Sequence, residues 1–135
     1  MGGLLVRAAV TGQGLSEVVR RVITLGTPYF GSVKAARLLD RGEGAPAFIP
    51  REAARLLALT CPGVYDLLPR YRCVTDGAGL RHLSEADIGG LGGDQGMAQE
   101  SQVRWDRLGL TTPQAPTGAW FPVVGAAQPT LQEVT

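Results

Sequence analysis

The sequence of 135 residues has little of several features on which chemistry and cellular compartment depend. It has one histidine, two cysteines and a net charge of +1 at pH 7, so a large basic surface for nucleic acid is not expected. No apolar run reaches the roughly 18 residues that a membrane-spanning helix needs. The chain does not begin with the basic and then apolar segments of a secretory signal peptide. We therefore expect no nucleic-acid partner and no transmembrane segment, and a cytoplasmic location is favoured.

The two cysteines, Cys61 and Cys73, are twelve positions apart. This spacing fits no common zinc pattern, so no metal site is expected. Such a pair can form a disulfide in an exported protein, whereas in a cytosolic chain both cysteines are free structural thiols. The second interpretation is favoured.

What the sequence does contain indicates one folded domain. Hydrophobic residues make up 44% of the chain, which is enough for a core and argues against disorder. Helical spacing of leucine and alanine predicts a helix over residues 2–11, and a β-branched run predicts a buried strand over residues 18–25. Ser32 fits the N-cap of a helix over residues 33–40 that ends before Gly42. A strand, a turn and a helix in this order favour the α/β class.

The middle of the chain is predicted to be a mostly helical insertion, followed by a second sheet strand at residues 120–124. Helices are expected at residues 51–60, 85–88 and 97–108, and a short turn or helix is expected at residues 62–68. A short strand is expected at residues 71–74, a turn at Asp76–Gly77 and a flexible glycine-rich loop at residues 89–96. Proline at position 122 is unusual for a central strand.

The first residues are typical of the second half of a nucleophile elbow. The elbow pattern G-x-S-x-G places a serine on a tight turn between a strand and a helix. Gly3 is predicted to be the second glycine, which must be small because the helix backbone passes close to the strand. Met1 would be the residue just after the serine and would supply a backbone N–H to the oxyanion hole. The alternative is that Met1 is only an initiator methionine.

Three further segments carry a resemblance to a known family. They are Val22–Pro28 followed by Gly31, Ser32 and Ala35; Pro62–Pro69, which contains Tyr65 and a Leu-Leu-Pro run; and Val123–Gly125 followed by Gln128–Thr130. These segments resemble parts of the lecithin:cholesterol acyltransferase-like α/β-hydrolases. The first resembles the strand and loop after the elbow helix, the second a cap segment, and the third the strand ahead of the catalytic acid.

The resemblance implies a partial α/β-hydrolase fold, with few parallel strands and flanking helices. It covers residues 1–135 as one domain, with a helical cap over residues 44–116. It implies an O-acyltransferase, lipase or esterase that acts on lipid esters through a serine acyl-enzyme and needs no cofactor. The family's serine, acid and histidine, which follow one another in that order, would all lie outside this chain. The isolated chain is then expected to be inactive; the alternative is a non-catalytic fragment or interaction module.

Five residues are candidates for a substrate pocket because they follow a strand end or lie in the cap segment. They are Tyr29, Phe30, Tyr65, Leu67 and Leu68. Packing of the cap against the core is the alternative for each of them.

Other residues whose side chains could act in catalysis are expected to be structural. His82 precedes the expected position of the acid, so we interpret it as a cap or surface residue rather than a general base. The aspartates at positions 66, 76, 87 and 94 lie in turns, helix starts or the cap segment, which indicates local hydrogen bonding.

Overall fold

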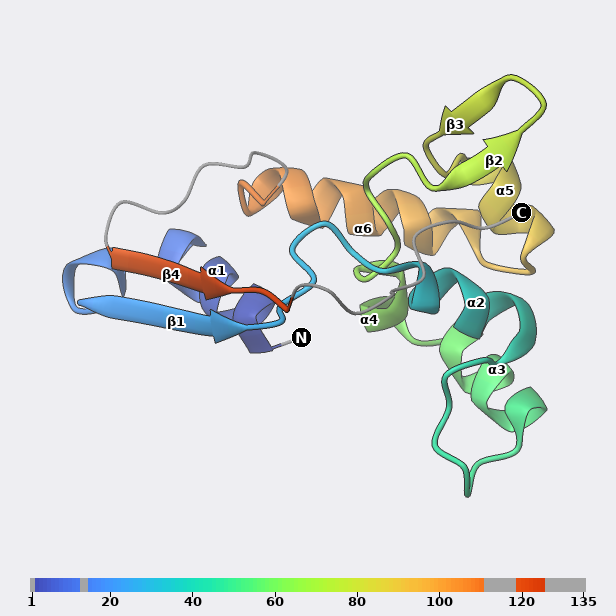
Figure 1. Cartoon of the computed structure of the whole chain (residues 1–135), viewed down its shortest axis with the longest axis horizontal. Coiled ribbons are helices and arrows are strands. Elements are labelled where there is room, and N and C mark those ends of the chain that lie inside the picture. Colours follow the sequence, from blue (N-terminus) through green and yellow to red (C-terminus); the bar gives the residue numbers. More distant parts are fainter. Residues whose placement is uncertain (1, 13–14, 111–118, 126–135) are drawn as a thin grey trace. The chain divides into compact units, whose positions relative to one another are not determined.

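A computed structural model describes residues 2–12, 15–110 and 119–125. It shows helices mixed with short strands, among them one parallel and one antiparallel pair (Figure 1). The chain divides into two compact units. Unit 1 contains the described residues 2–12, 15–29, 103–110 and 119–125, and unit 2 contains residues 30–102.

Unit 1 is built on the parallel pair of β1 (Arg21–Leu25) and β4 (Ala119–Val123). Both strands and the helix α1 (Gly2–Gly12) were expected from the sequence, and their presence is confirmed. The expectation that the first strand is buried was wrong, because Thr24 is the one buried residue of β1. β1 begins later than predicted because Leu15–Glu17 form a short 3-10 helix. The backbone N–H groups of Val18 and Val19 donate to the carbonyl of Leu15 and prolong that turn.

The proline in β4 is tolerated because of the direction in which its nitrogen points. The N–H of Gly26 donates to the carbonyl of Val123 at 2.9 Å, so the backbone groups of Val123 face β1. Backbone groups alternate in direction along a strand, and the nitrogen of Pro122 therefore faces away from β1. No ladder hydrogen bond to β1 is lost.

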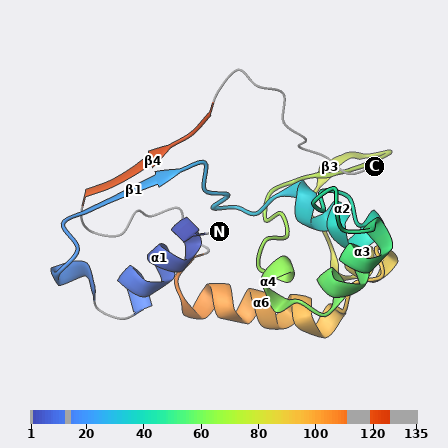
Figure 2. The same ribbon diagram turned by 90° about the horizontal axis from the view of Figure 1, so that it is seen from below.

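The two faces of the parallel sheet differ in how they are covered. α1 lies along one face (Figure 2), and its buried residues Leu4, Arg7 and Val10 recur at helical spacing. The opposite face carries four exposed apolar side chains in matched pairs, Ile23 beside Phe121 and Leu25 beside Val123. Their exposed fractions are 66%, 50%, 75% and 52%. We call these four residues the outer sheet face.

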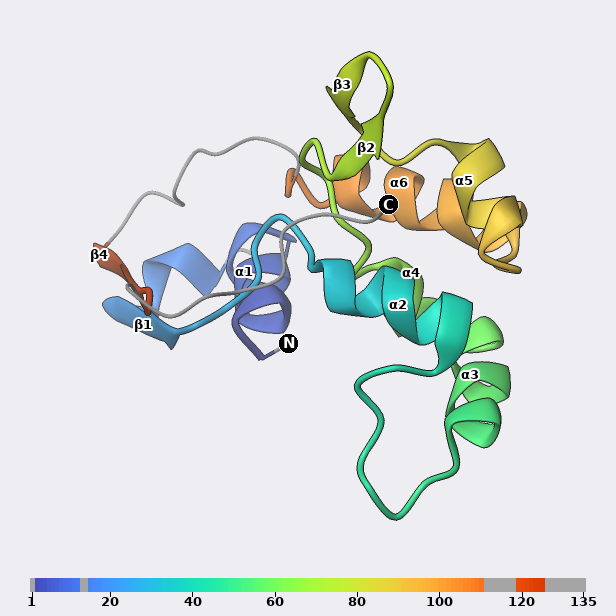
Figure 3. The ribbon, with the colours of Figure 1, turned by 45° about the vertical axis from the view of Figure 1, so that its right-hand side comes forward.

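Unit 2 is mainly helical. Its elements are α2 (Val33–Arg41), α3 (Arg51–Leu59), α4 (Pro62–Tyr65), β2 (Val74–Asp76), β3 (Gly79–Arg81) and α5 (Glu85–Gly90); α6 (Gln95–Arg107) begins in it. α2 and α3 lie side by side (Figure 3). The core cluster consists of Ala35, Ala36, Leu39, Ala58, Tyr65, Leu68 and Ile88.

The predicted ends of α2 are confirmed. The Ser32 side chain accepts a hydrogen bond from the backbone N–H of Lys34. Gly42 follows the helix with φ of 64°, and its N–H donates to the carbonyls of Arg37 and Leu38. A residue in the left-handed region at this position ends a helix, and glycine adopts it without strain.

Two predictions for the middle of the chain were wrong in detail. The strand expected at residues 71–74 lies at Val74–Asp76 and pairs with β3 in an unpredicted hairpin across the turn after Asp76. The loop expected at residues 89–96 is shorter, because α5 continues to Gly90 and α6 begins at Gln95. The Asp94 side chain accepts a hydrogen bond from the N–H of Met97 at 2.9 Å, which starts α6 inside the predicted loop.

The two cysteines are free thiols, as favoured from the sequence. Cys61 is exposed and Cys73 is buried. Burial raises the pKa of the Cys73 thiol, so this group stays protonated at neutral pH.

Candidate active site

Three segments of unit 1 meet at the carboxyl ends of its parallel strands (Figure 1). Leu25 and Val123 lie opposite each other at these ends. The first turn of α1 reaches the same edge, because a Cβ placed on Gly3 would lie 2.2 Å from Oγ1 of Thr27, two residues after β1. The carboxyl edge of a parallel sheet is where α/β proteins bind ligands. This edge is therefore the candidate active site.

The glycines at the start of α1 require a correction to the elbow prediction. A serine directly before Met1 would make Gly2, not Gly3, the second glycine of G-x-S-x-G. A Cβ on Gly2 would meet nothing within 4 Å, whereas one on Gly3 would overlap the Thr27 side chain. The position that requires a small residue is therefore Gly3, where α1 passes close to the loop after β1. Met1 itself lies outside the described residues.

A polar cluster fixes Tyr29 at this edge. The Tyr29 hydroxyl lies 2.6 Å from Oγ1 of Thr24, and Nε1 of Trp120 donates to it at 3.2 Å. The Tyr29 and Trp120 rings are tilted by 57° with centroids 6.3 Å apart, a common geometry for aromatic pairs. Tyr29, a predicted pocket residue, thus ties the loop after β1 to β1 and β4.

A buried arginine approaches the same ring. The guanidinium carbon of Arg7 lies 5.8 Å from the Tyr29 ring centroid, within the range of a cation–π interaction. Arg7 is only 5% exposed, and burial lowers its pKa. Sequence reasoning missed Arg7, although a charged residue midway between Leu4 and Val10 on an apolar helix stripe was a usable signal.

Phe30 and its neighbours belong to unit 2, where they contact the predicted cap segment. The Phe30 carbonyl accepts a hydrogen bond from the N–H of Arg70 at 2.8 Å, and the N–H of Ser32 donates to the carbonyl of Leu67 at 2.8 Å. A Cβ on Gly31 would lie 2.1 Å from the carbonyl oxygen of Leu68. Two of the segments that carry the family resemblance are therefore in direct backbone contact. The Phe30 side chain is 46% exposed.

The other predicted pocket residues lie in or against the core of unit 2. Tyr65 is 1% exposed and belongs to the core cluster with Leu68, while Leu67 is partly buried against it. The Tyr65 hydroxyl donates to the carbonyl of Leu59 and accepts from the N–H of Asp94, both at 2.9 Å. Core packing, the alternative considered for these residues, is what the structure shows for Tyr65 and Leu68.

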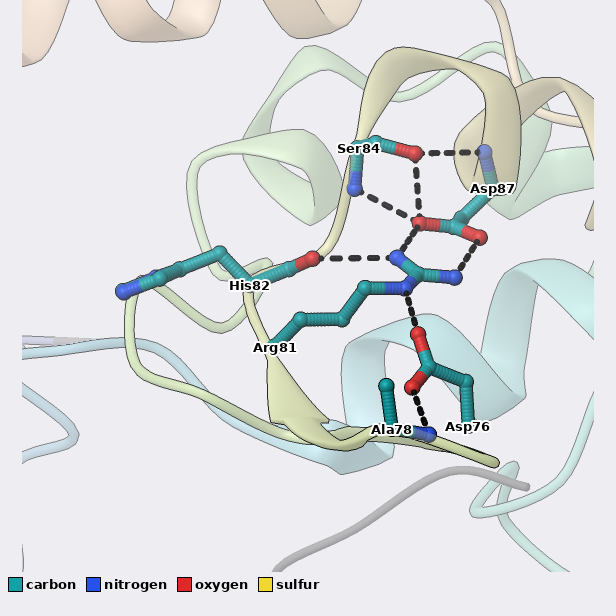
Figure 4. A network of polar contacts seen from close by, with 6 residues as sticks. All are labelled: Asp76, Ala78, Arg81, His82, Ser84 and Asp87. Atoms are coloured by element: carbon teal, nitrogen blue, oxygen red, sulfur yellow. Dashed lines mark hydrogen bonds and ion pairs between the residues drawn. The ribbon is translucent and has the colours of Figure 1, made fainter.

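Serine, histidine and aspartate occur close together in one place, but not as a catalytic set (Figure 4). The Ser84 hydroxyl donates to Asp87 at 2.6 Å as part of a capping box on α5. Arg81 donates to both carboxylate oxygens of Asp87, at 2.5 and 2.8 Å, and this arginine holds the pKa of Asp87 well below its usual range. The His82 ring points away from both residues, and only its backbone carbonyl joins the network.

This network is consequently structural. Arg81 also donates to Asp76 at 2.7 Å, so one guanidinium ties the hairpin to α5. A general base must reach the proton that it removes, and His82 does not reach Ser84. The expected surface role of His82 agrees with its exposure.

Two classes of feature are missing from the part of the chain that the structure describes. Residues 2–12, 15–110 and 119–125 contain no group of three or more side chains that could hold a metal ion. No helix within these ranges combines the length and apolar character needed to cross a bilayer.

Comparisons of the chain with models of protein families, with curated proteins and with solved structures found no match.

Proposed function

We propose that this chain is the interior of an α/β-hydrolase domain similar to lecithin:cholesterol acyltransferases. The complete domain would be an O-acyltransferase or lipase that acts on lipid esters. The observation that supports this most is the meeting of the first turn of α1 with the carboxyl ends of β1 and β4. A serine just before Met1 would extend from this edge, and the family resemblance implies an acid after Thr130.

The chemistry would be acyl transfer in two steps. The serine oxygen attacks the ester carbonyl, a histidine takes the serine proton and returns it to the departing alcohol, and an acyl-enzyme remains. Water or a second alcohol then attacks the acyl group, with the histidine again transferring the proton. The free N–H groups at the start of α1 favour negative charge, which suits the oxyanion of each tetrahedral intermediate.

Residues of this chain would position these groups. The absence of a side chain at Gly3 allows the start of α1 to approach Thr27. Tyr29, through its contacts with Thr24 and Trp120, holds the loop after β1 in place. No cofactor is needed for this reaction.

The outer sheet face supports the idea of a larger domain. Parallel sheets in α/β proteins are covered on both faces, whereas Ile23, Leu25, Phe121 and Val123 are each at least half exposed here. We propose that additional helices of the complete domain cover this face.

A second candidate function is that of a non-catalytic fragment or interaction module. It is favoured for the isolated chain by the position of the single histidine, whose ring points away from Ser84 and Asp87. The described residues then contain no working Ser-His-Asp set.

The coding DNA directly upstream of the Met1 codon tests the proposal. An in-frame Gly-x-Ser there is the expected result. A stop codon in its place would contradict the enzyme proposal and support the non-catalytic candidate.

A further inference from the structure

The loop between α2 and α3 has its two ends in close contact. Gly42 follows α2 and Arg51 begins α3, and a Cβ placed on Gly42 would lie 1.9 Å from the carbonyl oxygen of Arg51. Nε of Arg55 donates to the carbonyl of Asp40 at 2.8 Å, which ties α3 to the end of α2. The base of the loop is therefore held by contacts that do not involve the residues between its ends.

The tip of this loop, residues 46–48, is exposed and extends away from both helices (Figure 3). Phe48 is 85% exposed, more than any other large hydrophobic side chain among the described residues. Residues 42–50 form no helix or strand, and one backbone hydrogen bond lies wholly within them, from the N–H of Ile49 to the carbonyl of Pro46 at 2.9 Å. Exposed loop tips of this kind are the preferred sites at which proteases cut folded proteins.

The other large apolar side chains that unit 2 exposes have backbones that are less available. A protease binds its substrate as an extended strand, so the chain around the cut must give up its own hydrogen bonds. Leu56 and Leu57 lie within α3, and Leu80 lies within β3. The Phe30 carbonyl accepts a hydrogen bond from the segment that follows α4. Phe48 is therefore the exposed apolar residue of unit 2 whose backbone most easily enters a protease.

The proline that follows Ile49 distinguishes the two peptide bonds of Phe48. Cleavage after Phe48 would make Pro50 the second residue beyond the cut, where an extended substrate donates its N–H to the protease, and proline has no N–H. Cleavage before Phe48 places Ile49 at this position, and Ile49 has an N–H to donate. The Ala47–Phe48 bond is consequently the better substrate of the two.

We propose that the Ala47–Phe48 bond is a processing site for an endopeptidase whose pocket directly after the cut accepts a large apolar side chain. Water adds across this bond, so that Ala47 ends in a carboxylate and Phe48 begins with an ammonium group. The two pieces, residues 1–47 and 48–135, stay together, because Leu39 of α2 and Ala58 of α3 belong to one buried cluster. This inference is independent of the proposed acyl-transfer function.

The test is limited digestion of the whole chain with thermolysin, which cuts before large apolar residues. We expect the first cut within residues 30–102 to occur before Phe48, and F48S to slow it at least about tenfold, because serine does not fill an apolar pocket. The matched control L80S removes another exposed apolar side chain, 52% exposed in the original chain, and should be cut before Phe48 at the original rate. Mass spectrometry identifies the new terminus, while size-exclusion chromatography and circular dichroism show whether the pieces remain assembled and folded.

Three results would overturn this proposal. The first is an earlier cut at another bond within residues 30–102. The second is an F48S chain that is cut before residue 48 as fast as the original. The third is separation or unfolding of the two pieces once the bond is cut, which would show that the loop, and not the contacts at its base, holds α2 and α3 together.

Discussion

At the scale of single residues, a few close contacts determine which substitutions unit 2 tolerates. Gly31 has φ of +81° and lies against the carbonyl of Leu68, whereas Gly44 has φ of +93° with nothing near its Cβ position. Tyr65 is a core residue whose hydroxyl makes two hydrogen bonds. These positions allow steric, conformational and hydrogen-bond effects to be measured separately.

Gly31→Ala should destabilise the chain by more than about 2 kcal/mol, because the new methyl group overlaps a backbone carbonyl in addition to the cost of positive φ. Gly44→Ala is the matched control and should cost about 1 kcal/mol, the conformational part alone. Urea unfolding followed by circular dichroism measures both. Equal losses of stability in the two variants would show that the Leu68 carbonyl does not crowd the Cβ position of residue 31.

Tyr65→Phe should lower the free energy of unfolding by about 1–3 kcal/mol, because the N–H of Asp94 and the carbonyl of Leu59 lose their buried partner. Thr60→Val is a suitable control, since it removes an exposed hydroxyl bonded to a neighbouring carbonyl. Thermal and urea unfolding give the two values. A Tyr65→Phe protein as stable as the original would argue that this hydroxyl serves a ligand instead of the fold.

At the scale of elements, local signals were sufficient for the helices and insufficient for the hairpin. Ser32 and Gly42 define α2, and Ser84 defines the start of α5, through hydrogen bonds to residues close in sequence. The strands β2 and β3 have three residues each, too few for a period-two pattern to be recognised.

The candidate site was predictable only in part, because it depends on contacts between residues far apart in the sequence. Strand ends can be located from sequence, and Tyr29 was identified in that way. Its partner Trp120 is 91 residues away, and no local pattern reports such a contact. Arg7 was missed because the helical pattern was assigned from its apolar residues alone.

The network between the hairpin and α5 predicts a dependence of stability on pH. The pKa of Asp87 is lower in the folded chain than its value of about 3.9 in an unfolded one. The contribution of Asp87 to stability is therefore complete above about pH 5 and is lost as the pH falls toward the folded pKa. Asp87→Asn should cost about 1–2 kcal/mol at pH 7 through the lost cap and ion pair.

Urea unfolding between pH 5 and pH 3 tests this dependence. The difference in free energy of unfolding between the original chain and Asp87→Asn should become smaller as the pH falls. Glu85→Gln, in the same first turn of α5, should leave the pH dependence unchanged. If this difference in free energy of unfolding stays constant over the range, Asp87 is not paired with Arg81 in solution.

At the scale of the whole molecule, the outer sheet face should determine how the isolated chain behaves. Ile23 and Leu25 are 66% and 75% exposed on a sheet that normally has two covered faces. Apolar patches of this kind promote association and aggregation.

Ile23→Thr with Leu25→Lys should raise the solubility of the 135-residue chain while changing its free energy of unfolding by no more than about 1 kcal/mol. Light scattering against concentration, together with urea unfolding, measures both effects. In a protein extended to the complete domain, the same pair of changes should be strongly destabilising, because the face would then be covered. If the extended protein tolerated them equally well, the proposed covering layer would be wrong.

The measurement that tests the central proposal most directly is labelling with a serine-directed fluorophosphonate. It compares this chain with a version extended upstream through the elbow and downstream past Thr135, both checked for folding by circular dichroism. The account predicts labelling of the extended protein alone, at the serine before Met1. If both proteins are folded and neither is labelled, the chain is not part of a serine acyl-transfer enzyme.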